Sequence, residues 1–242
     1  MGNGILVICD HDAGTFKKTA YELISKAREL TASMGGQVTA LVLGATDAGD
    51  LGSYGVSTVL TATGEGVSRK DTGALARATQ AAIEASSPAV VLAPASAVMK
   101  DMLPRVAARS ELGLGTDITS LALKDGQLVA VRPMYAGKVL AEIRVSSTPA
   151  LYTVRPNSFP VADASGGAAT VQALSFELSA TDQGSTVVDE ERAGTSTADL
   201  TEADRIVSGG RAVKSAENYD ALIRPLADAV HATPGASRAA VD

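Results

Sequence analysis

The sequence predicts an α/β protein. It begins with a Rossmann-like parallel sheet, continues with an antiparallel extension, and ends with the start of a second doubly wound α/β domain. Up to Ala107, short apolar runs alternate with segments of helical spacing, which is typical of a parallel sheet covered on both faces. After Gly113, strand-like runs follow one another without helices, which indicates antiparallel pairing. Near the C-terminus, a strand, a glycine turn and a helix begin a new sheet.

Four apolar runs of the first half are expected to be buried parallel strands. They comprise residues 4–9, 38–43, 56–60 and 89–92. The helices predicted between and after them contain apolar positions within residues 16–34, 75–83 and 98–107. Gly35-Gly36 is expected to end the first helix, and Pro104 to bend the third.

The antiparallel part is predicted to contain strands at residues 118–123, 128–133, 139–145 and 150–154. Lys124-Asp125-Gly126 and Ala136-Gly137-Lys138 are turn sequences between them. A glycine-rich loop is predicted over residues 162–170, and a last strand over 171–178.

The expected domain boundaries follow from a change in composition. Residues 189–200 are acidic, polar and poor in apolar side chains, as is usual for an interdomain linker. We therefore expect an N-terminal α/β domain over residues 1–188, a linker over 189–204, and an incomplete second domain over 205–242.

Composition and charge argue against several classes of function. The 242 residues carry a net charge of −6 and only 3% aromatic residues, which is unlike a nucleic-acid-binding surface. His11 and His231 are far apart in the sequence, so no metal site is predicted. No Ser/His/Asp set has a recognisable catalytic spacing, so no catalytic residue is assigned.

The expected compartment is a reducing cytoplasm. The single cysteine, Cys9, lies in an apolar run and is expected to be a buried strand thiol. No signal peptide, transit peptide or apolar run long enough to span a bilayer is apparent in the sequence.

The segment Ser208-Gly209-Gly210-Arg211 is the strongest candidate for a binding site. It follows a short apolar run and precedes an amphipathic helix over residues 215–230, with Ser215 as the expected N-cap. Glycines at such a turn let the backbone approach a ligand, and Arg211 offers a cationic fork for phosphate. An ordinary turn between strand and helix is the alternative.

A second strand is predicted over residues 232–236, so Ser237 and Arg238 stand at its carboxyl end, beside that turn. A hydroxyl and a guanidinium there could hold a flavin, and a surface arginine is the alternative.

The apolar face of the preceding helix is expected to be core; it comprises Tyr219, Leu222, Ile223, Leu226 and Val230. Residues 132–138 are either a hairpin turn with exposed cations or a subunit contact.

Segments spread over nearly the whole chain, taken in order, resemble the alpha subunit of the electron transfer flavoproteins. They are the strand 5–9 followed by Lys17-Lys18, then residues 100–105, 117–119, 132–138, 153–156 and 199–204, Ser208-Gly209-Gly210-Arg211, and the C-terminal residues 235–242. The last two segments are the most specific.

This resemblance implies an N-terminal domain similar to the adenine nucleotide alpha hydrolases. It also implies a heterodimer with a beta subunit and one FAD, which is held mainly by the C-terminal domain of the alpha subunit. The expected function is a one-electron carrier. It would link flavin dehydrogenases, such as the acyl-CoA dehydrogenases of fatty acid β-oxidation, to a membrane quinone oxidoreductase.

The resemblance also implies cofactor-binding roles for individual residues. Arg211 matches the arginine on the phosphate side of FAD, and Ser237 matches another FAD contact. Arg238 matches the arginine near the isoalloxazine ring, which favours the anionic reduced forms. Gly209 and Gly210 belong to the same cofactor-binding turn. The AMP site of the family belongs to the beta subunit, so none is transferred to this chain.

Members of the family continue past the position of Asp242, and those residues supply further FAD contacts. The flavin site of this chain is therefore expected to be incomplete. A unit of about 40 residues rarely buries a core by itself. Residues 205–242 are thus expected to be weakly ordered unless something covers Leu222, Ile223 and Leu226.

Two other functions remain compatible with the sequence. A non-redox adenine-nucleotide-binding module would use the first domain, although residues 10–14 and 93–96 lack a persuasive phosphate loop. A scaffold subunit would dock a beta-type partner and bind no cofactor, which is the behaviour expected of the chain in isolation.

Overall fold

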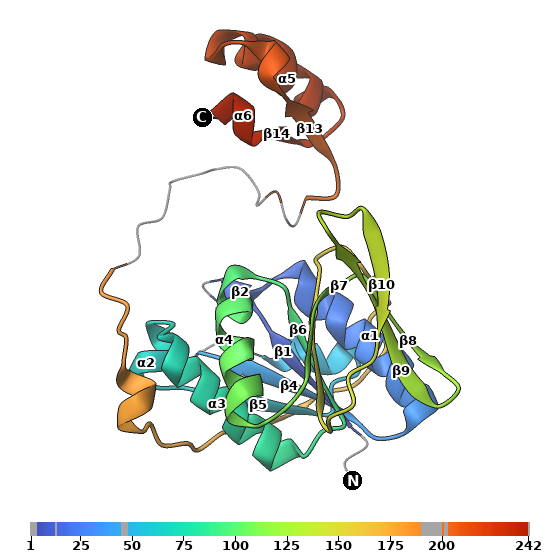
Figure 1. Ribbon diagram of the computed structural model, residues 1–242, viewed down its shortest axis with the longest axis vertical. Coiled ribbons are helices and arrows are strands. Elements are labelled where there is room, and N and C mark those ends of the chain that lie inside the picture. The colour runs from blue at the N-terminus through green and yellow to red at the C-terminus, as the bar shows by residue number, and fades with distance from the viewer. Residues whose placement is uncertain (1–3, 13, 45–47, 190–199, 201–202, 242) are drawn as a thin grey trace. The chain divides into compact units, whose positions relative to one another are not determined.

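The structure is a computed structural model that describes residues 4–12, 14–44, 48–189, 200 and 203–241 (Figure 1). The chain divides into two compact units, residues 1–190 and 191–242, and each is described by itself. Most of the predicted linker, residues 190–199 and 201–202, lies outside the described residues.

A seven-stranded sheet with parallel pairing throughout forms the centre of the first unit. The parallel sheet predicted from the four apolar runs of the first half is thereby confirmed. Its strand order is β12-β5-β4-β1-β6-β11-β7. The chain order reverses between β1 and β6, and open α/β sheets bind ligands at the carboxyl edge near such a reversal. The strands are β1 (Ile5–Cys9), β4 (Val38–Leu43), β5 (Thr58–Ala62), β6 (Val90–Pro94), β7 (Leu114–Ile118), β11 (Ala150–Val154) and β12 (Thr170–Ala173).

Helices cover both faces of this sheet because the side chains of each strand alternate between the faces. Helix α1 (Lys18–Met34) packs on one face with Ile5 and Val7. Helices α3 (Thr72–Ser86) and α4 (Ala97–Arg109) pack on the other face with Leu6 and Ile8. Figure 1 shows this arrangement. The short elements are α2 (Glu65–Ser68), β2 (His11–Asp12), β3 (Thr15–Phe16), η1 (Gly49–Tyr54) and η2 (Ala180–Gln183).

The long helices end and begin at residues with suitable backbone or side-chain chemistry. Gly35 ends α1 as predicted: its φ is 79°, and its N–H donates to the Thr31 carbonyl at 2.8 Å. Ser96 begins α4, because its hydroxyl accepts a hydrogen bond from the Met99 N–H at 3.4 Å. These hydrogen bonds define where α1 ends and where α4 begins.

The prediction that Cys9 is a buried strand thiol is confirmed. Cys9 is 2% exposed at the end of β1. Burial raises the pKa of its thiol far above the ordinary value, and the nearby carboxylates of Asp10 and Asp50 raise it further. The thiolate required for nucleophilic chemistry is therefore strongly disfavoured.

The antiparallel strands form a sheet of their own, in the order β10-β9-β8. They are β8 (Ser120–Lys124), β9 (Gln127–Met134) and β10 (Val139–Ile143). The turn at Asp125-Gly126 is confirmed, with φ values of 50° and 75°. The second predicted turn is confirmed as well, with Tyr135, Ala136 and Gly137 in the left-handed region.

Two expectations about this part of the chain are wrong. Residues 118–123 are not one strand, because Ile118 ends β7 in the parallel sheet and Ser120 begins β8 in the antiparallel one. Residues 150–154 are strand β11, but it pairs in parallel with β6 and β7. All five of its residues are buried, which suits the interior of a sheet covered on both faces.

Some predicted element bounds also differ from the structure. Strand β5 begins at Thr58, opposite Thr39 of β4, two residues later than expected. The strand predicted over residues 171–178 is shorter in the structure, where β12 ends at Ala173. Its four residues are exposed and pair with β5. Phe16 lies in β3 rather than in the first helix.

The second unit contains the predicted strand, turn, helix and strand. Strand β13 (Ile206–Gly209) pairs in parallel with β14 (Thr233–Ala236). The turn η3 (Arg211–Val213) and helix α5 (Ala216–Ala229) connect them, and α6 (Arg238–Val241) follows. The strand predicted over residues 232–236 is thus confirmed, with parallel pairing.

The expectation that the whole apolar face of α5 is core is wrong. Leu222 is 62% exposed, Leu226 is 53% exposed and Val230 is also exposed, whereas Tyr219 and Ile223 are half-buried. Two strands are narrower than the apolar stripe of a helix and cover only part of it. In the described part of the chain, no helix has the length and apolar character that crossing a membrane requires.

Candidate functional site

The carboxyl ends of β13 and β14 carry the predicted site, and the structure brings its segments together. Ser208 pairs with Gly235 and Gly209 with Ala236, so both strands end at the same level. The Ser237 N–H then donates to the Gly209 carbonyl at 2.9 Å. The turn after β13 therefore lies beside the start of α6.

The two glycines of this turn differ in their packing. A Cβ built on Gly209 would lie 2.9 Å from Val213 Cγ2 and 3.1 Å from Ile223 Cγ1, so glycine is needed for α5 to pack on β13. A Cβ built on Gly210 would meet the Ser237 hydroxyl at 3.8 Å, which is ordinary contact. Gly210 is extended, with φ −111°, so it opens space toward Ser237 without a left-handed backbone.

The amino end of α5 faces the same space. Ser215 is confirmed as the N-cap, because its hydroxyl accepts a hydrogen bond from the Asn218 N–H at 3.2 Å. The Asn218 side chain donates to the Val213 carbonyl at 2.9 Å and holds the turn against the helix. Hydrogen bonds from the Ser215 hydroxyl and from the Glu217 N–H lower the pKa of the Glu217 carboxyl. A bound phosphate would compete with Glu217 for these donors.

A cavity of about 680 Å³ lies at this edge, and we call it the α5 pocket. Its charged lining is Arg211, Lys214, Arg224 and Asp220, and Asp220 pairs with Arg224. The positive charges therefore exceed the negative ones. The other lining residues are small or apolar apart from two hydroxyls; they are Val213, Ser215, Ala216, Tyr219, Ala236, Ala239 and Ala240. A basic pocket at the amino end of a helix suits a phosphate group.

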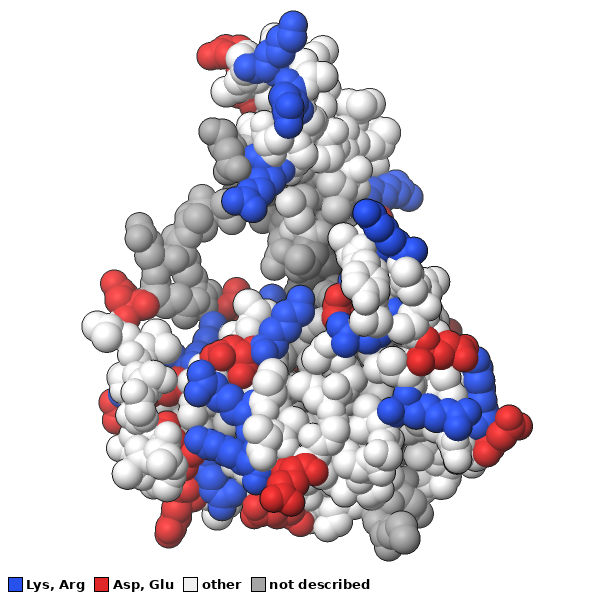
Figure 2. All heavy atoms as spheres, in the orientation of Figure 1, with Lys and Arg blue, Asp and Glu red and all other residues white. Residues whose placement is uncertain are grey.

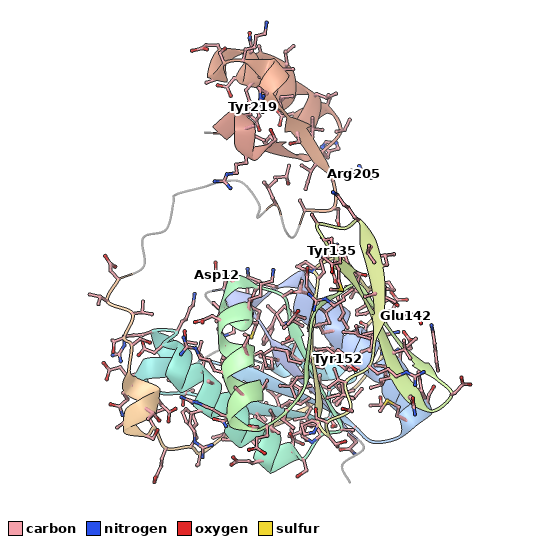
Figure 3. The ribbon with its side chains drawn as sticks, viewed as in Figure 1. Asp12, Tyr135, Glu142, Tyr152, Arg205 and Tyr219 are labelled. Atoms are coloured by element: carbon pink, nitrogen blue, oxygen red, sulfur yellow. The ribbon has the colours of Figure 1, made fainter. Side chains whose placement is uncertain are left out.

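Lys214, Tyr219 and Arg224 line the pocket without having been predicted as site residues. Tyr219 is labelled in Figure 3, and its hydroxyl donates to the Gly235 carbonyl at 3.1 Å. The Arg224 guanidinium lies 5.9 Å from the centre of the Tyr219 ring. Two sequence signals could have found the cations. Arg224 follows Asp220 by four residues, which is the spacing of an ion pair along a helix. Lys214 directly precedes Ser215, the N-cap of α5.

Arg238 flanks the pocket. It is the first residue of α6 and its side chain is exposed. The next two residues of α6, Ala239 and Ala240, contribute to the pocket lining. Among the described residues, no group of three or more His, Cys, Asp or Glu side chains is arranged to hold a metal ion.

Family models match both units of the chain. The model described as the electron transfer flavoprotein domain matches residues 5–179. The model described as the electron transfer flavoprotein FAD-binding domain matches residues 199–242, which contain the α5 pocket.

Similar proteins include electron transfer flavoprotein alpha subunits from two bacteria. The Clostridium acetobutylicum subunit is 32% identical over 248 residues, which covers 99% of this chain and 74% of the relative. The Bacillus subtilis subunit is 30% identical over 247 residues, covering 100% and 74%. Protein FixB of Clostridium saccharobutylicum is 31% identical over 244 residues, covering 99% and 73%. The chain belongs to the electron transfer flavoprotein alpha-subunit family.

Proposed function

We propose that this chain is the alpha subunit of a heterodimeric electron transfer flavoprotein and that the α5 pocket is the part of the FAD site that this chain supplies. The observation that carries the proposal is the pocket itself. It combines an excess of positive charge, the capped amino end of α5 and small residues from the end of β14 and from α6. FAD would supply the capacity to accept and release electrons one at a time.

The residues present fit the parts of such a cofactor. Arg211 would pair with the phosphate side of FAD, because its guanidinium is a fixed fork of hydrogen-bond donors. Gly209 allows close packing, and Gly210 leaves space toward Ser237. Ser237 would donate a hydrogen bond to the cofactor. Arg238 would stabilise negative charge on the reduced ring, since it begins α6 beside the pocket.

Lys214 and Arg224 extend this proposal beyond the residues singled out in the sequence. Lys214 lines the pocket directly before the N-cap and would add a second cation on the phosphate side. Arg224 is held by Asp220 and by the face of Tyr219, so it would contribute a positioned charge. Together they would raise the affinity for a doubly charged pyrophosphate.

The wider role that we propose is electron transfer in fatty acid β-oxidation. Electrons would pass from flavin dehydrogenases, such as acyl-CoA dehydrogenases, through the FAD of the heterodimer to a membrane quinone oxidoreductase. The family membership of the chain supports this role. The beta-type subunit would be its permanent partner, and the cytoplasm its compartment.

The test is reconstitution with the partner. The full-length protein is co-produced with a beta-type electron transfer flavoprotein subunit, purified, incubated with FAD and examined by absorption spectroscopy. We expect a yellow heterodimer with a flavin spectrum. A heterodimer that stays colourless after incubation with FAD would refute the flavin function. Tight binding of ATP or AMP by the first unit alone would favour the adenine-nucleotide module instead.

A further inference from the structure

The first unit contains a cavity of about 670 Å³, which we call the Arg144 pocket. Segments distant in the sequence line it: the end of α1, the amino ends of β6 and β11, the turn between β8 and β9, and residues 144–148. Its volume is within the range of pockets that hold small molecules. It lies at the amino ends of parallel strands, whereas the switch-point edge of such sheets is at the carboxyl ends.

The walls of the Arg144 pocket are aliphatic. Six of the side chains that form them are Met34, Ala89, Val90, Leu128, Val145 and Ala150. All six belong to the core on the α1 face of the sheet or pack against it. Met34, Leu128 and Val145 are only partly buried, so they offer apolar surface to the cavity. Among the described residues that line the pocket, none is aromatic, which suits a ligand with an aliphatic body.

The backbone at the amino ends of β6 and β11 is engaged within the sheet. The Ala89 N–H donates to the Gly4 carbonyl at 2.8 Å, and the Ala150 N–H donates to the Ala89 carbonyl at 3.0 Å. These groups are therefore satisfied without a ligand. A polar group of a ligand would bind instead to side chains at the rim.

The rim carries one cation, Arg144, among the lining residues that the structure describes. Its Nη1 donates to Oε1 of Gln127, which also lines the pocket, so the guanidinium is held beside the turn between β8 and β9. A guanidinium has five N–H donors, so Arg144 can bind a ligand as well.

The nearby carboxylate of Glu142, labelled in Figure 3, is bound mainly by another cation. Lys124 lies 2.6 Å from it and lowers the pKa of its carboxyl most strongly, and the charge of Arg144 lowers that pKa further. Basic and acidic side chains adjoin one another over the turn between β8 and β9, at the right of Figure 2. Because Glu142 is paired with Lys124, it does not neutralise the rim of the pocket.

A single guanidinium at the rim favours a carboxylate. Its planar fork matches two carboxylate oxygens, and its one charge balances a monoanion. A phosphate carries more negative charge and suits several cations, as in the α5 pocket. The hydroxyls of Ser146 and Thr148 line the same rim and can donate to the anion.

The end of α1 orients the ligand. Ser33 and Met34 are the last residues of this helix, and the carboxyl end of a helix carries partial negative charge. An anion is therefore disfavoured there and favoured at Arg144. The aliphatic body would lie toward Met34.

We propose that the Arg144 pocket binds an aliphatic monocarboxylate, such as a medium-chain fatty acid anion. Its carboxylate would pair with Arg144, and its chain would lie against Met34, Leu128 and Val145. This inference goes beyond the proposed function, because the Arg144 pocket belongs to the first unit and the α5 pocket to the second.

The experiment is a calorimetric titration of the full-length protein with sodium octanoate, at concentrations where octanoate is monomeric. The uncharged probe with the same number of carbons is 1-octanol. Arg144→Gln removes the cation, and Ala89→Leu fills part of the cavity and keeps the charge. The matched control is Arg105→Gln on α4, which changes an exposed arginine that is paired with Asp101 and lies outside the lining.

We expect one octanoate per chain, with a dissociation constant below about 1 mM. Arg144→Gln should weaken binding at least about tenfold, because the charged hydrogen bonds to the carboxylate are lost. Ala89→Leu should weaken it to a similar extent, because the larger side chain occupies the space of the ligand. The probe 1-octanol should bind at least about tenfold more weakly than octanoate. The control should bind octanoate as the unchanged protein does.

Three results would overturn the inference. The first is that the unchanged protein binds no octanoate. The second is that Arg144→Gln binds it within about twofold of the Arg105→Gln control, or that 1-octanol binds as tightly. The third is that several octanoates bind per chain and a folded Ala89→Leu protein binds as many, which indicates adsorption to the surface. If Ala89→Leu does not fold, the comparison of Arg144→Gln with the control decides. FAD reconstitution is measured separately, so the two proposals can fail independently.

Discussion

The carboxylate of Asp182 lies 2.6 Å from the guanidinium of Arg109, and this pair attaches the last described segment of the first unit to α4. Asp182 also accepts hydrogen bonds from the Ser179 N–H at 2.8 Å and from the Ser179 hydroxyl at 2.7 Å. Five residues later, the Val187 N–H donates to Asp71 at 2.6 Å. Residues 179–187 therefore form a strap held by two carboxylates.

Asp182→Asn should release this strap. Burial raises the pKa of Asp182, but the hydrogen bonds from Ser179 and Arg109 outweigh it and lower the pKa overall. The substitution weakens those bonds, so we expect the free energy of unfolding to fall by about 1–3 kcal/mol in urea. Limited proteolysis should also cut the strap faster. Glu84→Gln, in a solvent-exposed pair with Arg77, is the matched control and should change little.

The same pair predicts a dependence of stability on pH. Because the folded pKa of Asp182 lies below its unfolded value, its contribution is present above the unfolded pKa and is lost as pH falls through the folded pKa. Urea unfolding from neutral to acidic pH should show a smaller loss for Asp182→Asn than for the unchanged protein. Equal losses in both proteins would contradict this assignment.

Gly73→Ala should destabilise the protein although Gly73 lies in helix α3. Replacing an exposed glycine within a helix by alanine usually raises the stability of the protein by about 0.5–1 kcal/mol. Here the new Cβ would lie 2.0 Å from the Asp182 carbonyl oxygen, so the strap must move. We expect a loss of about 1–3 kcal/mol in urea unfolding. Gly184→Ala is the control, because Gly184 has φ −69° and a Cβ there would lie 3.7 Å from the Thr181 carbonyl oxygen, which is ordinary contact. An increase in stability for Gly73→Ala would show that the strap yields freely.

Glu22→Gln should stabilise the protein, and this gain in the free energy of unfolding should grow as pH rises. Glu22 is 1% exposed in α1, and burial raises the pKa of its carboxyl against the opposing effects of Lys18 and of backbone N–H groups at residues 157–159. A raised folded pKa means that stability present at low pH is lost as pH rises through it. The neutral amide avoids that loss. The gain over the unchanged protein should therefore grow between acidic and neutral pH, and a gain that is largest in acid would contradict the prediction.

Arg211→Gln should reduce flavin retention in the reconstituted heterodimer. The substitution removes the guanidinium fork from the α5 pocket, and a charged hydrogen bond to phosphate is worth about 1.5–3 kcal/mol. We expect at least about a tenfold rise in the FAD dissociation constant, measured by fluorescence titration. Lys214→Gln should act in the same direction. Arg77→Gln, on α3 of the first unit, is the charge-matched control and should leave FAD binding unchanged.

Local chemistry made several parts of this protein predictable. Strand β4 was predicted at its observed bounds because five of its six residues are apolar and Gly36 and Gly44 lie on either side of the run. Ser215 was predicted as an N-cap because a hydroxyl before an amphipathic segment satisfies a free helix N–H. The pairing of β13 with β14 followed from the strand-turn-helix-strand order.

Strand partners and surface exposure required the tertiary structure. The apolar run of β11 is compatible with either direction of pairing, and only its insertion between β6 and β7 made it parallel. The apolar spacing of α5 was evident, but the exposure of Leu222 and Leu226 depends on how much of the helix two strands can cover. Lys214 and Arg224 joined the pocket because a turn and a helix face converge there.

The sequence by itself determined the local elements and the glycine-arginine turn, because these depend on residues close together along the polypeptide. It also determined the family, because the motifs of the family occur in order along the chain. The tertiary structure decided which strands pair, which apolar side chains stay exposed, and that Asp182 meets Arg109. The physical reason is that periodicity and capping are short-range effects. Strand pairing and charge clusters depend instead on contacts between distant segments, which form only when the chain is folded.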